Sequence, residues 1–278
     1  VLCVDRAGIV GADGATHNGV LDIAFLRSIP GVKIFCPSDF AELRVMLSRA
    51  IYRETGPVAI RYPRGSEGAY RKELSAQPLV CVHEQSGSEV TIVTHGIMVN
   101  QAIDAAEILM HEGIRAQVYK VNEIGSGLEQ AYAEVKEKLG GWCVVAEDVV
   151  PNGSVGEWLA AHRRERTDLL NTGDRFLPHG GVNELYRHCG IDAEGIAAYY
   201  KDAATVKVHA LNEALPENGL YSNAMAGTDR MELYLTVNAA GDQMMLVSVF
   251  DNLGKGSSGA AVQCMNLMLG LEETKGLE

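Results

Sequence analysis

The sequence has no long hydrophobic run. Apolar residues make up 47% of its 278 residues, but no stretch approaches the roughly 18 consecutive apolar residues of a membrane-spanning helix. The N-terminus reads VLCVDRAG and lacks the basic segment followed by an apolar one that a secretion signal needs. No initiator Met precedes Val1, so we expect the chain to begin inside a domain, on a buried strand. These absences predict a soluble cytoplasmic protein without a membrane partner.

Positive charge and paired cysteines are also scarce. The chain has 24 Lys and Arg against 36 Asp and Glu, a net charge of −12, and shows no basic face. This balance argues against binding to nucleic acid or to anionic membranes. The cysteines are scattered along the chain, at Cys3, Cys36, Cys81, Cys143, Cys189 and Cys264. They form no C-x-x-C pair, and several stand within apolar runs, so we expect buried free thiols in a reducing compartment.

What is present is an alternation of short apolar runs and amphipathic segments, from residue 1 to about 200. The expected strands lie at 1–5, 32–36, 58–62, 89–95, 116–121, 142–148 and 169–173. The expected helices lie at 38–53, 98–112, 128–139, 154–165 and 182–189. The first of these helices has a start signal, with Ser38 as the N-cap and Glu42 in its first turns. The alternation predicts an α/β fold with mostly parallel sheets covered by helices.

Two changes in sequence pattern divide the chain. A polar, Gly- and Ser-rich stretch at 65–88 indicates a boundary between two α/β units, each with one sheet. After about residue 203 the βα pattern stops. The segment 231–250 is typical of two strands joined by a Gly-containing turn, and a helix is expected at about 257–269.

The stretch DRAGIVGADGATHNG, residues 5–19, combines bare backbone with reactive side chains. It follows an expected buried strand, and ligands of open α/β sheets bind beyond the carboxyl ends of strands. Its glycines, which permit positive φ and close approach of a ligand, are Gly8, Gly11, Gly14 and Gly19. Arg6 offers donors for a phosphate or carboxylate, while Asp13 and His17 can orient hydroxyls or relay a proton.

A second strand end, RYPRG at 61–65, supplies two further arginines. Either Arg61 or Arg64 could join Arg6 around a phosphate, and each charge-assisted hydrogen bond would contribute about 1.5–3 kcal/mol. The alternative is a solvated Gly-rich loop with an Asp cap, in which the arginines only pair with carboxylates. The spacing alone leaves both interpretations open.

Longer motifs favour the first interpretation. The stretch 5–19 is followed by LRSIPGVKIFCPSD and GPVAIRYPRG, and together these resemble the pyrimidine-binding domain of the 1-deoxy-D-xylulose-5-phosphate synthase family. The resemblance continues through WCVVAED and residues 169–196 into a transketolase-type C-terminal domain. It implies a partial pyrimidine-binding domain at 1–68, a linker at 69–88 and a transketolase C-terminal α/β domain at 89–198. Enzymes of this family are thiamine-diphosphate-dependent transferases that condense pyruvate with glyceraldehyde 3-phosphate, for isoprenoid and thiamine biosynthesis. They are homodimers.

The resemblance also assigns roles by matching position. Arg6 and Arg64 would clamp the phosphate of glyceraldehyde 3-phosphate, and Asp13 and His17 would contact its hydroxyls and carbonyl, with His17 as a proton shuttle. Asn18 departs from the His or Gln common in the family. The family's Gly-Asp-Gly motif for Mg²⁺ and pyrophosphate, and its Glu for the aminopyrimidine, have no counterpart here. We therefore expect most of the thiamine diphosphate and Mg²⁺ site to lie outside this chain, and the chain alone to be inactive or a non-catalytic scaffold.

The stretch DNLGKGSSGAAVQ, residues 251–263, fits G-x-G-x-x-G, the pattern of dinucleotide-binding turns. An ordinary Rossmann unit also needs a second strand and an acidic residue about 20 positions on, which the sequence before Glu278 does not supply. Residues 199–278 instead resemble the C-terminal part of the N-acetyl-γ-glutamyl-phosphate reductase family, which is NADP-dependent and belongs to arginine biosynthesis. This resemblance implies that Asn252, Lys255 and Gly256 lie near the nicotinamide of NADP. The family's catalytic Cys and His have no counterpart.

The two resemblances meet near residues 197–204. Neither family's active site is complete, so we expect a truncated or chimeric product rather than a working fusion. The tail at 199–278 is expected to be a small α+β piece, a hairpin and a helix. We expect its hairpin to expose apolar side chains, namely Leu233, Leu235, Met245 and Val247.

Overall fold

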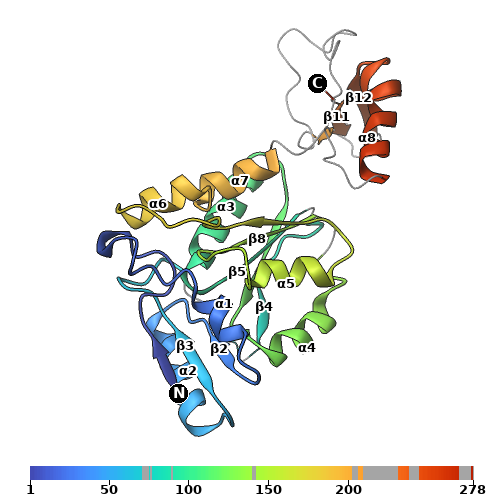
Figure 1. The fold of residues 1–278 in the computed structure, drawn as a ribbon. Coiled ribbons are helices and arrows are strands. Elements are labelled where there is room, and N and C mark those ends of the chain that lie inside the picture. Colours follow the sequence, from blue (N-terminus) through green and yellow to red (C-terminus); the bar gives the residue numbers. More distant parts are fainter. Residues whose placement is uncertain are drawn as a thin grey trace. The chain divides into compact units, whose positions relative to one another are not determined.

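The computed structural model describes residues 1–70, 75, 77–88, 90–139, 142–201, 206–208, 231–237, 244–268 and 277. The chain divides into two compact units, Val1–Tyr199 and Tyr200–Glu278, and each is described by itself (Figure 1).

The first sheet of the N-terminal unit is short and mostly parallel. Its strands, in spatial order, are β1 (Leu2–Val4), β3 (Val58–Arg61), β2 (Lys33–Phe35) and β7 (Glu123–Ile124). β1, β3 and β2 run parallel, as the alternation of strands and helices predicts, and β7 pairs antiparallel with β2. The connecting helices are α1 (Asp22–Arg27) and α2 (Phe40–Tyr52). The carboxyl ends of β1, β3 and β2 therefore meet at one edge of the sheet, where loop side chains can converge.

The second sheet has five strands and is also mostly parallel. Its order is β4 (Leu79–His83), β6 (Ala116–Val121), β5 (Val90–His95), β8 (Trp142–Ala146) and β9 (Thr167–Leu170). Only β4 runs antiparallel to its neighbour, β6. The helices of this part are α3 (Val99–His111), α4 (Ser126–Val135), α5 (Val155–His162), α6 (Val182–Cys189) and α7 (Ala193–Lys201). β4 lies within the 69–88 segment that we expected to be a linker, so part of that segment is sheet.

One hydrophobic core joins the two sheets. Its fully buried members from the first sheet and its helices include Ile23, Leu26, Ile34 and Ala59. Its members from the second sheet and its helices include Leu79, Val93, Tyr119, Val145 and Leu159. Because both sheets contribute to the same cluster, the two predicted α/β units pack against each other within the N-terminal unit.

The start of α2 differs from the prediction by one residue. Asp39, not Ser38, is the N-cap, because Asp39 has extended backbone and its Oδ1 accepts a hydrogen bond from Glu42 N at 2.8 Å. The hydroxyl and backbone N–H of Ser38 both donate to Glu42 Oε2, each at 2.8 Å. The same carboxylate oxygen pairs with Lys120 Nζ, which β6 supplies. A buried ion pair thus connects α2 to the second sheet.

The cysteines follow the prediction in part. Cys36 and Cys143 are buried, and burial raises the pKa of each thiol to about 12, which keeps both protonated and unreactive. Cys3 and Cys264 are exposed, against the expectation of buried thiols. Cys3 is exposed because neither face of β1 is covered at this point: successive side chains of a strand point to opposite faces, and the neighbouring Leu2 is exposed as well.

The C-terminal unit contains the predicted hairpin and helix. β11 (Met231–Val237) pairs antiparallel with β12 (Met244–Phe250), and β10 (Val206–Val208) pairs parallel with β11. After β12 the backbone forms a π-helical turn, Gly254–Ser258, which leads into α8 (Gly259–Met268). Met245 is 56% exposed, as expected, whereas Val247 is half-buried. The side chains of Leu233 and Leu235 lie outside the described residues.

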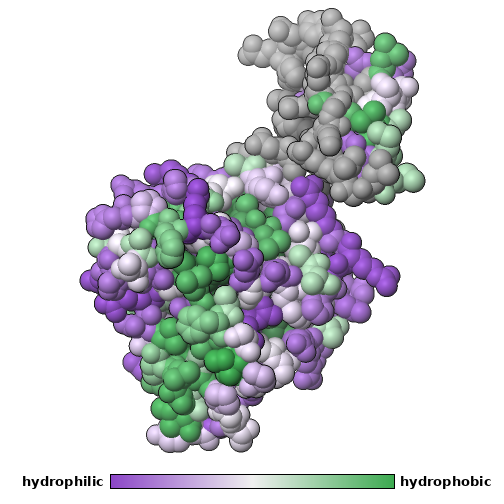
Figure 2. All heavy atoms as spheres, in the orientation of Figure 1, coloured by the Kyte–Doolittle hydropathy of each residue, from purple (hydrophilic) through white to green (hydrophobic). Residues whose placement is uncertain are grey.

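Hydrophobic side chains are concentrated on one part of the surface of the N-terminal unit. Figure 2 shows hydrophobic side chains gathered over the part built from β1, β2, β3 and α2. Exposed apolar residues on or beside these elements include Val1, Leu2, Ile51 and Tyr52. No helix among the described residues is both long and apolar enough to cross a membrane.

Candidate active site

The loop 5–19 leaves the carboxyl end of β1 and returns to its own starting point. Gly19 N donates to the carbonyl of Arg6 at 3.1 Å, and Gly8 N donates to the carbonyl of Gly19 at 3.2 Å. Arg6 has φ of 59°, a left-handed conformation that is uncommon for residues other than glycine. Between these anchors a short 3₁₀ turn, Gly11–Asp13, brings Asp13 back towards Arg6. The loop is thus closed by backbone hydrogen bonds before any ligand arrives.

Asp13 lies between two guanidinium groups. Its Oδ2 accepts a hydrogen bond from Arg6 Nε at 3.0 Å, and its Oδ1 pairs with Arg64 Nη1. Arg6 also pairs with Asp5 at 2.6 Å. Hydrogen bonds from Arg64 and Arg6 lower the pKa of Asp13, and the hydrogen bond to Asp13 raises the pKa of Arg6. At neutral pH all three groups are therefore charged, and two cations face the same point of the surface.

His17 lies in the same loop but makes a different contact. Its backbone N–H donates to the carbonyl of Gly14 at 3.1 Å, and its Nδ1 is 3.0 Å from Thr16 Oγ1. The side chain is exposed. Of the four residues predicted for this site, Arg6 and Arg64 therefore contact the third, Asp13, directly. The fourth, His17, lies four positions after Asp13 and its side chain is exposed to solvent.

Asn18, which departs from the family pattern, has a structural contact inside the loop. Its Oδ1 accepts a hydrogen bond from Val10 N at 2.8 Å. The side chain thus braces the loop across its middle, a role that a longer Gln or a His would have to meet with different geometry.

The bare backbone of the loop is explained mainly by the protein's own packing. A Cβ on Gly8 would lie 1.7 Å from Asp148 Oδ2, one on Gly11 2.2 Å from the carbonyl of Gly180, and one on Gly19 2.2 Å from the carbonyl of Arg6. Only Gly14, with φ of 83°, has nothing within 4 Å of that position. Three of the four glycines admit neighbouring protein atoms, so the expectation that all four admit a ligand was too broad.

The structure distinguishes the two arginines of RYPRG. Arg64 is exposed and reaches Asp13. Arg61 is 4% exposed and points beneath the loop, where it pairs with Asp22 and Asp148. Sequence reasoning missed both carboxylates. The available signal was a charged residue inside the apolar run VAIRY, which requires a buried partner.

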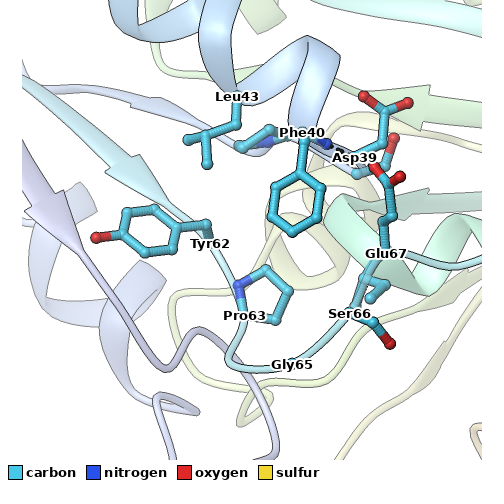
Figure 3. A pocket seen from close by; sticks show the side chains of 11 residues that line it. Asp39, Phe40, Leu43, Tyr62, Pro63, Gly65, Ser66 and Glu67 are labelled. Atoms are coloured by element: carbon cyan, nitrogen blue, oxygen red, sulfur yellow. Dashed lines mark hydrogen bonds between the residues drawn. The ribbon is translucent and has the colours of Figure 1, made fainter.

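A small pocket lies beside the strand end that carries Arg64. Figure 3 shows Phe40, Leu43, Tyr62 and Pro63 around it, with Glu67 at its side. Its volume is about 40 Å³, enough for a few water molecules and too small for thiamine diphosphate. This pocket is therefore not the site of thiamine diphosphate. Among the residues that the structure describes, no three His, Cys, Asp or Glu side chains gather into a set that could hold a metal ion.

The residues proposed for NADP lie at the turn after β12. Asn252 is exposed, Gly256 N donates to the carbonyl of Asp251 at 2.9 Å, and Lys255 stands inside the π-helical turn. A Cβ on Gly256 would lie 2.7 Å from the ring of Phe250, so packing against the hairpin accounts for this glycine.

Comparison with known proteins assigns the N-terminal unit. Residues 1–68 match the family described as transketolase, pyrimidine binding domain, and residues 80–196 match transketolase, C-terminal domain. The N-terminal unit has a transketolase-like α/β fold whose two parts match these two domains. The transketolase-like α/β fold predicted for residues 1–198 is therefore confirmed over these two stretches.

The curated relatives that match this chain share one name. The chain is 38% identical over 217 residues to a 1-deoxy-D-xylulose-5-phosphate synthase of Chlorobium luteolum, covering 75% of this chain and 34% of the relative. It is 39% identical over 208 residues to the enzyme of the same name from Caldanaerobacter subterraneus subsp. tengcongensis, covering 71% and 32%. The chain thus spans about a third of the length of these relatives.

Solved structures agree on the fold. A split-gene transketolase described as an inactive β4 tetramer has a TM-score of 0.59 and 26% identity, covering 72% of this chain and 64% of that one. A transketolase from Campylobacter jejuni has a TM-score of 0.62, covering 72% and 31%, and at 18% identity supports the fold of these transketolase domains alone. Both family matches end at or before residue 196, so they do not bear on the resemblance of the tail to a reductase.

Proposed function

We propose that the N-terminal unit is the triose-phosphate-binding part of a thiamine-diphosphate-dependent synthase of the 1-deoxy-D-xylulose-5-phosphate type. The observation that carries this proposal is the convergence of Arg6 and Arg64 on Asp13 at the carboxyl edge of the first sheet. In the free protein Asp13 neutralises part of the charge of the two guanidinium groups. A phosphate of glyceraldehyde 3-phosphate would take donors from both arginines, in hydrogen bonds worth about 1.5–3 kcal/mol each.

The remaining polar groups suit the rest of such a substrate. Asp13 would hold a hydroxyl of the triose. His17 bonds Thr16 through Nδ1, so its Nε2 is the atom that would exchange a proton with the substrate's carbonyl oxygen. Thiamine diphosphate supplies the carbanion-stabilising chemistry of this enzyme class, with pyruvate as the donor substrate. The residues of this chain bind and orient the acceptor, and the cofactor and Mg²⁺ are bound by protein outside the described residues.

Titration of the full chain with D-glyceraldehyde 3-phosphate tests the phosphate site. Arg64→Gln is expected to weaken binding about tenfold or more, because one charge-assisted hydrogen bond is lost. Arg44→Gln is the matched control, since Arg44 is exposed on α2 and its replacement removes the same charge. Calorimetry that finds equal affinities for the two variants would contradict the proposal.

An activity test follows from the share of the relatives that this chain spans. We expect no turnover when the chain is incubated alone with thiamine diphosphate, Mg²⁺, pyruvate and glyceraldehyde 3-phosphate. Addition of the part of the Chlorobium luteolum relative that this chain does not match is expected to restore condensation. Full activity of the chain alone would show that its cofactor site is complete.

The resemblance of the tail to a reductase is a second, separate proposal. The hairpin, the turn and α8 form where the resemblance implies, and Asn252 is exposed at the turn. If this turn takes part in binding NADP, fluorescence titration with NADPH should give saturable binding that Asn252→Ala weakens. Absence of binding would leave the tail without a nucleotide role.

A further inference from the structure

A buried cluster of charges supports the loop 5–19 from below. Arg61, at the carboxyl end of β3, is 4% exposed, and its Nη2 donates to the carbonyl of Gly19 at 3.1 Å. The same nitrogen lies 3.5 Å from Asp148 Oδ1, and Arg61 Nε lies 3.4 Å from Asp22 Oδ2. Asp148 follows β8 of the second sheet, so one guanidinium joins the loop, α1 and the second transketolase domain.

The contact between Asp148 and the loop leaves no free space. Gly8 has φ of 71°, and a Cβ at this position would overlap Asp148 Oδ2 at 1.7 Å. Asp148 is 3% exposed. The Asp148 carboxylate therefore makes two contacts. It lies against the backbone of the loop at Gly8, and it pairs with the Arg61 guanidinium, which in turn binds the carbonyl of Gly19.

The cluster leads back to Arg6 by a continuous series of hydrogen bonds. Asp148 bonds Arg61, Arg61 bonds the carbonyl of Gly19, and Gly19 N donates to the carbonyl of Arg6 at 3.1 Å. Arg61 also stands three residues before Arg64 on the same strand end. Because the charge of Arg61 is buried, removal of its partner leaves an uncompensated charge, and the guanidinium must move or draw in water.

We propose that Arg61 and Asp148 are positioning residues for the triose-phosphate site, through which the second transketolase domain sets the distance between Arg6 and Arg64. The inference rests on the proposed function and adds a role for the second domain, which supplies none of the side chains of the phosphate site itself. Asp148 holds Arg61, Arg61 holds Gly19, and the closed loop presents Arg6 and Asp13 opposite Arg64. Arg61 does not touch the substrate.

The experiment measures the affinity of the full chain for D-glyceraldehyde 3-phosphate in four single variants, well below their unfolding temperatures. Wild type is expected to bind and Arg6→Gln to lose binding; failure of either result contradicts the proposed function rather than this inference. Asp148→Asn, which keeps the shape and removes the charge, is expected to weaken binding about fivefold to tenfold. Arg61→Gln is expected to weaken it at least as much. The control Asp104→Asn removes an exposed charge from α3 of the same domain and should bind like wild type.

A double variant separates positioning from a general loss of structure. If Asp148 acts through Arg61, the variant Arg61→Gln with Asp148→Asn binds no more weakly than Arg61→Gln alone, since both changes interrupt the same chain of contacts. If the loss of affinity in the double variant equals the product of the losses in the two single variants, the inference is overturned. So would a folded Asp148→Asn variant with the affinity of wild type, because a merely structural carboxylate lowers the unfolding temperature without changing the affinity.

A measurement on the unmodified chain covers the case in which the variants do not fold. Hydrogen exchange without ligand is expected to protect the amides of Gly8 and Gly19 as strongly as that of Ile60 in β3, because the same cluster holds the loop and the strand end. Exchange of the two loop amides at least tenfold faster than that of Ile60 would show that the loop opens independently, and the inference would fall.

Discussion

Asp22 carries the most unusual carboxyl group near the site. Burial raises its pKa to about 6; the charge of Arg61 acts against this shift and that of Asp148 adds to it. Because the pKa is higher in the folded than in the unfolded chain, protonated Asp22 stabilises the fold fully below about pH 4, and this contribution is lost as the pH rises through about 6.

The sign of this shift gives a testable difference. Asp22→Asn is neutral at every pH, so its unfolding temperature should rise relative to wild type between pH 5 and pH 8. Calorimetry of both proteins measures the difference, and Asp174→Asn, at an exposed position, is the control. A difference that stays constant over this pH range would show that Asp22 is not neutralised in the folded state.

The individual residues also show what a single sequence can and cannot supply. Arg6, Asp13 and His17 could be found because they crowd into one glycine-rich stretch after a strand. The choice between Arg61 and Arg64 could not be made from spacing, since it depends on which side chain is buried at the end of β3 and which lies exposed in the turn after it. Asp148 was missed because its partners Gly8 and Arg61 stand 140 and 87 positions away along the chain.

At the scale of elements, the periodic segments were predicted well and the short ones were not. The expected helix at 182–189 coincides with α6, and the expected strand at 116–121 with β6. β4 and β7 were missed because one lies in a polar, glycine-rich stretch and the other has two residues, too few for a period. Both pair antiparallel at the edge of their sheets, where tertiary contacts rather than local pattern decide.

The corrected start of α2 leads to a prediction at this scale. Asp39→Ala removes the hydrogen bond to Glu42 N and should lower the free energy of unfolding by about 1 kcal/mol. For a unit of this size the unfolding temperature should fall by about 2–4 °C. Ser48→Ala, an exposed change on the same helix, is the control. If Asp39→Ala unfolds at the same temperature as Ser48→Ala, the Asp39 side chain does not stabilise the start of the helix.

At the scale of the whole molecule, the exposed apolar surface of the N-terminal unit predicts self-association. β1 is an edge strand of its sheet, and Leu2 on it is 51% exposed beside further apolar residues (Figure 2). Such edges tend to pair with other chains, and charge on them prevents it. Sedimentation velocity should show concentration-dependent association that Leu2→Lys weakens and Phe176→Lys, outside the first sheet and its helices and 81% exposed, does not. A monomer at every concentration would contradict this.

The division into two compact units predicts where a protease cuts first. The units part between Tyr199 and Tyr200, and boundaries between compact units are preferred sites of cleavage. Limited proteolysis should therefore give an early cut between residues 197 and 215 and a stable N-terminal fragment. Even cleavage along the whole chain, with no such fragment, would show that the two parts are not separate folding units.

The fit of Gly8 against Asp148 restricts how this protein can be recombined. These residues stand 140 positions apart in the sequence, and the Asp148 carboxylate fills the space that a side chain at position 8 would need. A substitution at either position therefore depends on the residue at the other. A hybrid that joins residues 1–68 to the second domain of a relative needs a short acidic side chain at position 148. That side chain must pair with Arg61 and fit against Gly8. Exchange of the second domain without regard to position 148 would therefore displace the loop 5–19 even where both domains still fold.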